Sequence, residues 1–146
     1  MYKLEELQPL IIEWAREKDL IKLENAPKQR LKLIEECGEL ASAILKNNVE
    51  LQKDAVGDIF VVLIILSRQV KSEINLDFEN FKVETNDITN LLLDITYTYD
   101  RPDTEIVWLN ELSNLLKLDL TECVNLAWNE IKDRKGNTIN GTFLKN

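Results

Sequence analysis

The chain has 146 residues, which is enough for one ordinary domain with its own hydrophobic core. Its 26 acidic residues outnumber its 18 basic residues, and the formal net charge of −8 disfavours binding to nucleic acid or to an anionic membrane. The absence of histidine excludes Ser-His-Asp and Cys-His nucleophile systems and His-ligated zinc. Any enzymatic chemistry must therefore rely on carboxylates, lysines, arginines and a bound metal ion.

Several sequence features indicate a cytoplasmic protein. Cys37 and Cys123 are isolated and have no CxxC spacing, so we interpret them as small buried hydrophobes in a reducing compartment. The N-terminal residues show no signal-peptide layout. The longest apolar run, Ile59 to Leu66, is much shorter than the roughly 20 residues that span a bilayer. We therefore expect no membrane association.

The spacing of apolar residues and the few breakers predict an all-α fold. Only four glycines and three prolines occur, too few for the many turns of an all-β protein. We expect one helical bundle of five or six helices over residues 1–146, with 134–146 as a C-terminal tail. Asp103 or Thr104 is a candidate N-cap, Gly136 a candidate C-cap, and Asn140-Gly141 a turn within an extended ending. The expected helices cover about 4–18, 27–46, 49–70, 83–99, 104–116 and 120–132, and 71–81 is a loop with one helical turn.

The run from Ile59 to Leu66 is rich in β-branched residues and is compatible with a buried strand. We interpret it as helix because Leu51 to Gly57 has a helical pattern and no turn residue separates the two segments. A helix that is apolar on every side must be buried on every side. The run therefore predicts a central helix, or one shared with a second subunit.

Two carboxylates lie on one edge of the second helix. At 100° per residue, Glu36 and Glu39 share a narrow stripe with Gln29, Lys32 and Ala43, whereas Glu35 points towards solvent. Two acids three residues apart can hold one cation. The broad apolar face beside this stripe is expected to contain Leu33, Ile34, Cys37, Leu40, Ala41, Ile44 and Leu45.

The third helix supplies two more acids, Asp54 and Asp58, which are four residues apart and share a face. The short Asn47-Asn48 connection predicts antiparallel neighbouring helices, so the hairpin can bring these acids to Glu36 and Glu39. Oxygen ligands without histidine or paired cysteine point to Mg²⁺, or to Mn²⁺. The alternative is an ordinary solvated face with i,i+4 ion pairs, of which Lys32–Glu36 is a candidate.

These residues resemble the MazG-like all-α nucleotide pyrophosphohydrolase family, whose pattern is ExxE on one helix and ExxD on the next. Residues 29–41 and 53–63 carry this resemblance, and position 55, where the pattern has Glu, is Ala55 here. The ending, Ala127–Gly136 followed by Ile139–Phe143, is similar to that of short phage-type members. The likeness covers roughly residues 8–70 and 120–145.

The resemblance implies Mg²⁺-dependent cleavage of a nucleoside triphosphate, NTP or dNTP, between its α and β phosphates. Glu36, Glu39 and Asp58 would be the catalytic metal ligands, and Asp54 would take the place of the missing acid at position 55. Either Glu35 or Glu39 would accept the proton from the attacking water. The resemblance also implies a homodimer or a homotetramer.

Other side chains are candidates for substrate binding. Lys32 and the cluster Lys132, Arg134 and Lys135 can hold phosphate, although the cluster also fits favourable charge at a helix C-terminus. Gln29 is a candidate for contacts to base or sugar. The tryptophans at 14 and 128 fit base stacking or, more simply, the core.

Two other functions remain open at this point. One is a nucleotide- or metal-binding regulatory protein without significant turnover, which Ala55 makes conceivable. The other is an acidic helical interaction protein that imitates the charge of DNA. A charge mimic should spread its acids over the surface, whereas Asp58 directly precedes the longest apolar run. That position favours a site.

Overall fold

The computed structural model describes residues 1–84, 87–97 and 101–146. Within these ranges it contains six α-helices and one small antiparallel sheet, which confirms the all-α bundle. None of these helices is both long enough and apolar enough to cross a membrane. The elements are α1 (Leu4–Glu17), α2 (Ala26–Leu45), α3 (Val49–Gln69), α4 (Ile88–Tyr97), α5 (Pro102–Leu115), α6 (Leu120–Ile131), β1 (Gly136–Ile139) and β2 (Thr142–Lys145), with 3₁₀ helices at Leu23–Asn25 and Phe78–Asn80.

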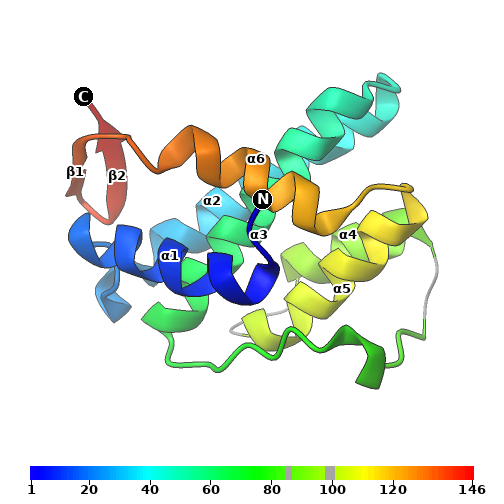
Figure 1. The fold of residues 1–146 in the computed structure, drawn as a ribbon, viewed down its shortest axis with the longest axis horizontal. Coiled ribbons are helices and arrows are strands. Elements are labelled where there is room, and N and C mark those ends of the chain that lie inside the picture. Colours follow the sequence, from blue (N-terminus) through cyan, green and yellow to red (C-terminus); the bar gives the residue numbers. More distant parts are fainter. Residues whose placement is uncertain (85–86, 98–100) are drawn as a thin grey trace.

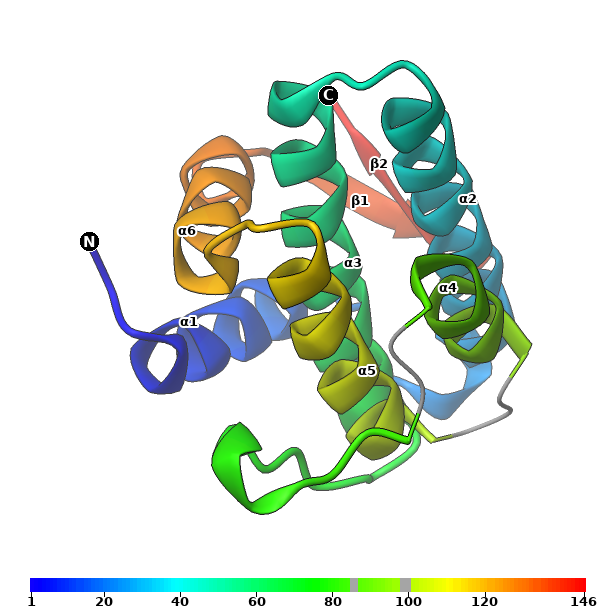
Figure 2. The same ribbon diagram turned by 90° about the vertical axis from the view of Figure 1, so that its right-hand side faces the viewer.

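Helix α3 runs through the middle of the molecule, between α2 on one side and α6 on the other, and α1 and α5 also pack against it (Figures 1 and 2). Every residue from Ile59 to Leu66 is buried, which confirms the helical interpretation of the apolar run. Its own chain covers this apolar run on all sides. The apolar run therefore does not require a second subunit.

The α2–α3 connection forms the predicted tight antiparallel hairpin (Figure 2). Asn47 takes a left-handed conformation, with φ of 51°, to end α2. The side chain of Asn48 caps α3 by accepting a hydrogen bond from the Leu51 backbone N–H at 3.1 Å. The buried Gln52 amide donates to the Ala43 carbonyl oxygen at 3.4 Å. These contacts fix the start of α3 relative to the end of α2.

The buried face of α2 is rotated from the expected one. Ile34 and Leu45 were expected in the core, but they are 51% and 84% exposed. Gln29, Glu36 and Ala43, which were expected beside the apolar face, are buried instead. Helix α3 packs against this side of α2 and buries Gln29, Glu36 and Ala43, whereas Lys32 and Glu39 of the same stripe stay exposed. Part of the polar stripe, including Glu36, therefore lies in the interhelical contact.

The C-terminal segment is a paired hairpin rather than a single extended tail. Asn140 and Gly141 both have positive φ, 52° and 82°, as a type I′ hairpin turn requires. This turn places Ile139 opposite Thr142 in the β1–β2 register. Gly136 lies in β1 and does not cap α6, so the predicted C-cap was wrong.

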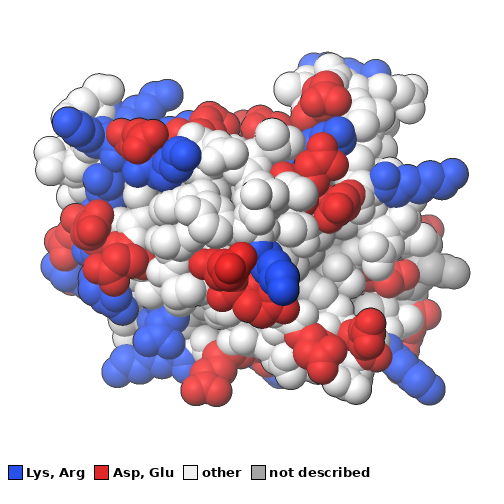
Figure 3. All heavy atoms as spheres, viewed as in Figure 1, with Lys and Arg blue, Asp and Glu red and all other residues white. Residues whose placement is uncertain are grey.

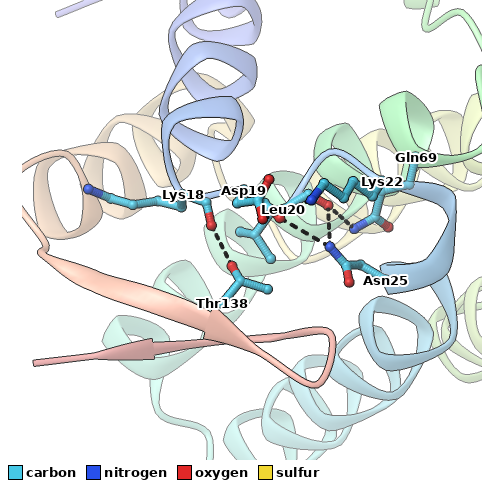
Figure 4. Close-up of polar contacts among 7 residues, drawn as sticks. All are labelled: Lys18, Asp19, Leu20, Lys22, Asn25, Gln69 and Thr138. Carbon is cyan, nitrogen blue, oxygen red and sulfur yellow. Dashed lines mark hydrogen bonds and ion pairs between the residues drawn. The ribbon is translucent and has the colours of Figure 1, made fainter.

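The hairpin and the α1–α2 connection are fastened to the same end of the bundle (Figure 4). Thr138 donates to the Lys18 carbonyl oxygen, and both Asn25 and Gln69 donate to the Leu20 carbonyl oxygen, at 3.1 and 2.9 Å. On the hairpin, the Phe143 ring meets the Trp14 ring edge to face. These bonds hold the start of α2 in place.

The remaining predicted boundaries are close to the observed ones. The 71–81 segment is a loop with one 3₁₀ turn at Phe78–Asn80, as expected. Helix α5 begins one residue before Asp103, with Pro102 in its first turn and Arg101 as N-cap, so the predicted caps were wrong. Of the helix expected over 83–99, residues 85–86 and 98–99 lie outside the described residues.

Candidate metal centre

Carboxylates from three helices converge beside the α2–α3 hairpin. One oxygen each from Glu36, Glu39 and Asp58 lie within 4.8 Å of one another. Oxygens of Asp54, Asp58 and Glu130 form a second such group, so Asp58 belongs to both. We call these five residues the acidic cluster. The hairpin brings together the four acids that the sequence singled out, and α6 adds a fifth.

Glu36 is the most buried member, with 4% of its surface exposed. Its Oε1 lies 3.2 Å from the Lys32 ammonium nitrogen, whereas its buried Oε2 has no hydrogen-bond partner among the described residues. Burial raises the pKa of Glu36 to about 7, Lys32 lowers it, and the charge of Glu39 raises it. An unpartnered buried carboxylate oxygen is costly unless something binds it.

Asp58 lies at the centre of the acidic cluster. Burial, followed by the charges of Glu36 and Asp54, raises its pKa from 3.8 to about 8. The pKa of Asp54 is raised by burial and by Glu130 and Glu39, and lowered by Arg134. The cluster therefore resists full ionisation unless additional positive charge is bound.

The donor set fits a hard divalent cation. All five side chains offer carboxylate oxygens, the ligands that Mg²⁺ and Mn²⁺ take, and the cluster contains no sulfur or imidazole ligand. The buried Oε2 of Glu36, which has no hydrogen-bond partner among the described residues, could supply a ligand atom to such a cation. The residues could hold such an ion, and it would offset the repulsion that raises the pKa of Asp58.

Glu130 is the functional candidate that sequence reasoning missed. It reaches Asp54 and Asp58 because α3 and α6 approach closely at Gly57, where a Cβ atom would lie 2.2 Å from the Cys123 carbonyl oxygen. The same Cβ would lie 3.0 Å from the Ala127 side chain, one helical turn before Glu130. Small residues facing each other on two helices are the only sequence signal for this approach.

The predicted phosphate-binding residues separate into two groups. Lys32 contacts Glu36, and the guanidinium of Arg134 pairs with Glu130 at 2.6 Å, so both border the acidic cluster. Lys132 and Lys135 are exposed and form no ion pair with any described residue. Gln29 is buried and donates to the Val62 carbonyl oxygen at 3.4 Å, so its amide faces α3.

The structure also places the residues with alternative interpretations. Trp14 and Trp128 are 7% and 9% exposed and belong to the hydrophobic core. Glu35 is exposed and pairs with Lys32 at 2.5 Å outside the acidic cluster, whereas Glu39 lies within it. Of the two candidate proton acceptors, Glu39 has the better position.

A separate hollow of about 1020 Å³ lies between α1, the 71–81 segment and α5. Its lining includes Glu5, Glu73, Asp77 and Glu79 and no lysine or arginine. An acidic wall of this kind repels phosphate, and these acids do not converge on a point as those of the acidic cluster do. The acidic cluster between α2, α3 and α6 is therefore a better candidate for a metal and phosphate site than this hollow.

Comparison with known proteins bears directly on the helices that carry the cluster. Residues 25–86 match the family model described as the MazG nucleotide pyrophosphohydrolase domain. This segment is MazG-like. The segment contains Glu36, Glu39, Asp54 and Asp58. The match confirms the resemblance that the sequence of the two helices predicted.

A relative of the MazG-like segment occurs in Haemophilus phage HP1 (strain HP1c1), where it is described as an uncharacterized 18.2 kDa protein in the rep-hol intergenic region. The two chains are 42% identical over 69 residues, which is 47% of this chain and 42% of the phage protein. The match thus spans less than half of either protein. No solved structure matches this chain significantly. Glu130, on α6, lies outside the segment that matches the family model.

Proposed function

We propose that this protein is a Mg²⁺-dependent nucleoside triphosphate pyrophosphohydrolase that cleaves NTP or dNTP between the α and β phosphates. The products would be a nucleoside monophosphate and pyrophosphate. The observation that carries the proposal is the buried, unpartnered Oε2 of Glu36, whose carboxylate converges with those of Glu39 and Asp58. The MazG-like match over residues 25–86 supports this reaction class.

We propose a role for each acidic side chain around Glu36 and for its basic neighbours. Glu36, Glu39 and Asp58 would hold Mg²⁺, or Mn²⁺, and Asp54 borders them. When bound, the cation neutralises the triphosphate and lowers the pKa of an attacking water. Of these three proposed ligands only Glu39 is exposed, and we assign it to accept the proton of that water. Lys32 and Arg134 can hold phosphate oxygens at the rim of the cluster.

The direct test is pyrophosphate release from a panel of NTPs and dNTPs with Mg²⁺ or Mn²⁺. We expect release by the wild type, with loss of at least about 100-fold in Glu39→Gln and Asp58→Asn, because charge stabilisation dominates phosphoryl chemistry. Glu50→Gln is the matched control, since Glu50 is an exposed carboxylate on the same helix as Asp58. It should stay close to the wild type.

No release from any nucleotide by folded protein would contradict the catalytic proposal. Tight nucleotide or metal binding without release would favour a regulatory protein instead. The buried Ala55, where the family pattern has an acid, is the feature compatible with that outcome.

The DNA-charge mimic receives less support. Positive and negative side chains are interleaved across the face shown in Figure 3, and lysines and arginines gather around the end that carries the β-hairpin. A mimic of DNA presents a continuous row of negative charge. The partially buried acids of α2 and α3 suit a bound cation better.

We also propose that the protein self-associates. The argument is the exposed apolar side chains of α2, because the apolar run of α3 is already buried within one chain. Helix α2 exposes Leu31, Ile34 and Leu45, at 59%, 51% and 84%. Burial of such side chains against a second copy would stabilise a homodimer or homotetramer. Light scattering should find an oligomer that Ile34→Lys converts to monomer, and a monomeric wild type would contradict this part.

A cytoplasmic location is also part of the proposal. Cys37 and Cys123 are both buried and unpaired, as expected of cysteines that serve as small hydrophobes. Burial raises the pKa of each thiol to about 12, so neither is a reactive thiolate. Fractionation of cells that express the full chain tests the location.

A further inference from the structure

The segment that follows α3 passes over the bundle in an extended form. Residues 72–77 belong to no helix or strand, and from Glu73 to Phe78 exposed and half-buried residues alternate. Such alternation has the two-residue period of an extended chain, in which successive side chains point to opposite sides. The half-buried Ile74, Leu76 and Phe78 pack against the hydrophobic core. The core therefore holds the segment in place along its inner side.

The backbone of this segment is unpaired. In the part of the chain that the structure describes, no N–H or carbonyl group of residues 73–76 forms a hydrogen bond to another protein group. The segment runs past α5 with no strand beside it (Figures 1 and 2), and a hollow of about 1020 Å³ lies between it, α1 and α5. An extended segment with unpaired backbone groups is a template to which a further strand can be added.

The charged side chains that line this hollow are all acidic. Residues 72–81 contain three acids and no basic residue, and Glu5 of α1 supplies a fourth acid. None of these four carboxylates forms an ion pair with a described residue. Glu73 and Asp77 are four residues apart, so they lie on the same side of an extended chain. The hollow thus complements a strand that carries positive charge at alternate positions.

Other occupants fit this hollow less well. Two copies paired along the same segment would set Glu73 and Asp77 opposite acids, and like charges directly opposite each other destabilise a strand pair. Phosphate and nucleic acid are repelled by the same acids. Small-ligand pockets have volumes of roughly 300–1,000 Å³, so this hollow is at the upper end of their range. Its size and its extended wall suit several residues of a peptide.

We propose that residues 73–77 bind a lysine- or arginine-rich segment of another protein, which adds to them as a β-strand. Main-chain hydrogen bonds to the extended segment supply affinity, and basic side chains at alternate positions pair with Glu73 and Asp77. Five paired residues span about 17 Å. The hollow is separate from the acidic cluster, so this inference goes beyond the proposed function and does not depend on it.

The experiment measures binding of a fluorescein-labelled decapeptide of alternating lysine and threonine to the full chain by fluorescence anisotropy. We expect saturable binding at about 50 mM salt that weakens at least about tenfold at about 500 mM, because salt screens exposed charges. A peptide of alternating glutamate and threonine should not bind.

Charge reversal tests the position of the peptide. Glu73→Lys combined with Asp77→Lys should lower the affinity at least about tenfold, because lysines would then face lysines. Glu13→Lys combined with Glu17→Lys is the matched control, which should stay within about threefold of the wild type. It changes the net charge equally at two acids that are also four residues apart but lie outside the hollow. All four residues are exposed, so both double variants should fold.

Amide hydrogen exchange, followed by nuclear magnetic resonance, tests strand addition itself. In a strand pair only alternate N–H groups of each strand face the partner. The bound lysine peptide should therefore slow the exchange of alternate amides within residues 73–76 at least about tenfold. Attraction between charges alone would leave these amides unprotected.

Three results would overturn the inference: no saturable binding of the lysine peptide, an equal loss of affinity in the two double variants, or binding without slower exchange at any amide of residues 73–76. A wild-type oligomer that Glu73→Lys with Asp77→Lys converts to monomer would also overturn it, because the hollow would then hold a second copy. Pyrophosphate release should be the same in this variant and the wild type, so failure of the proposed function would be seen separately.

Discussion

Two glutamates of this molecule are similar in burial and in pKa but differ in the acids that lie near them. Glu36 on α2 is 4% exposed and Glu105 on α5 is 1% exposed. Burial raises the pKa of each carboxyl to about 7. Near Glu36, however, Glu39 and Asp58 converge on one point, whereas Glu105 belongs to no group of acids that could hold a metal within the described residues.

The carboxylate of Glu105 is buried without a hydrogen-bond partner among the described residues. Neither of its oxygens accepts a hydrogen bond of normal geometry in the described structure. After burial, the nearby Arg101 backbone N–H lowers its pKa, Asp103 raises it, and Arg30 lowers it. A buried acid with a raised pKa is therefore not in itself a site. Convergence of further acids from other helices makes the difference.

The largest difference is expected in catalysis. Asp58→Asn should reduce pyrophosphate release at least about 100-fold, because it removes the carboxylate shared by both acidic groups. Glu105→Gln should stay within about twofold of the wild type, since no cluster oxygen depends on it. The rates are measured at saturating Mg²⁺ with the best nucleotide of the panel.

An equal loss of rate in the two folded variants would show that the acidic cluster does not distinguish Asp58 from Glu105, and that burial of an acid alone affects the rate. A wild-type rate in Asp58→Asn would instead remove Asp58 from the site.

The second difference concerns pH and metal. The folded pKa values of Glu36, Asp58 and Glu105 lie above their ordinary values, so between about pH 4 and pH 8 the folded state holds more protons than the unfolded state. The free energy of unfolding of the metal-free protein should therefore fall as pH rises through this window. We expect a loss of at least about 1 kcal/mol between pH 5 and pH 8 in urea titrations.

Millimolar Mg²⁺ should divide this pH dependence into two parts. A bound cation favours the ionised forms of Glu36 and Asp58, so their share of the loss should disappear, while the share of Glu105 should remain. Glu105→Gln should remove the remaining part. If Mg²⁺ changes neither the pH dependence nor the stability, the acidic cluster does not bind the ion under these conditions.

Much of the fold follows from local signals in the sequence, and the parts that do not are long-range. Breakers such as Asn47-Asn48 and Pro102 mark helix ends locally, and the predicted bounds lie within a few residues of the observed ones. The rotation of α2, which exposes Ile34 and buries Glu36, depends on which side α3 covers. Periodicity along one helix cannot supply that information.

The candidate site shows the same division. Glu36, Glu39, Asp54 and Asp58 are within one hairpin, whose short connection makes their meeting predictable. Glu130 joins them from α6, about seventy residues further along the chain, so no local pattern announces it. The β-hairpin could have been predicted, because the dipeptide Asn140-Gly141 is a strong hairpin signal in a sequence. In the structure both residues have the positive φ that such a turn requires.

The contribution of α6 can be tested through Gly57 rather than through an acid. A Cβ at this position would lie 2.2 Å from the Cys123 carbonyl oxygen, so Gly57→Ala must push α6 away from α3. We expect a loss of about 1–3 kcal/mol in the free energy of unfolding, as for overpacking in a core, and weaker Mn²⁺ binding to the acidic cluster. Urea unfolding and calorimetry measure the two effects. An unchanged stability would show that the interface is looser than this distance implies.

The smallest effect is expected at Gly38, which lies between Glu36 and Glu39 on the outward side of α2. A Cβ there would meet no atom within 4 Å, so the acidic cluster leaves this position unconstrained. Gly38→Ala should stabilise α2 by about 0.5–1 kcal/mol, because alanine loses less backbone entropy than glycine in a helix, and should leave Mn²⁺ binding unchanged. Replacement by alanine should thus lower the free energy of unfolding at Gly57 and raise it at Gly38. Destabilisation by Gly38→Ala, measured by urea unfolding, would contradict the open surroundings of this position.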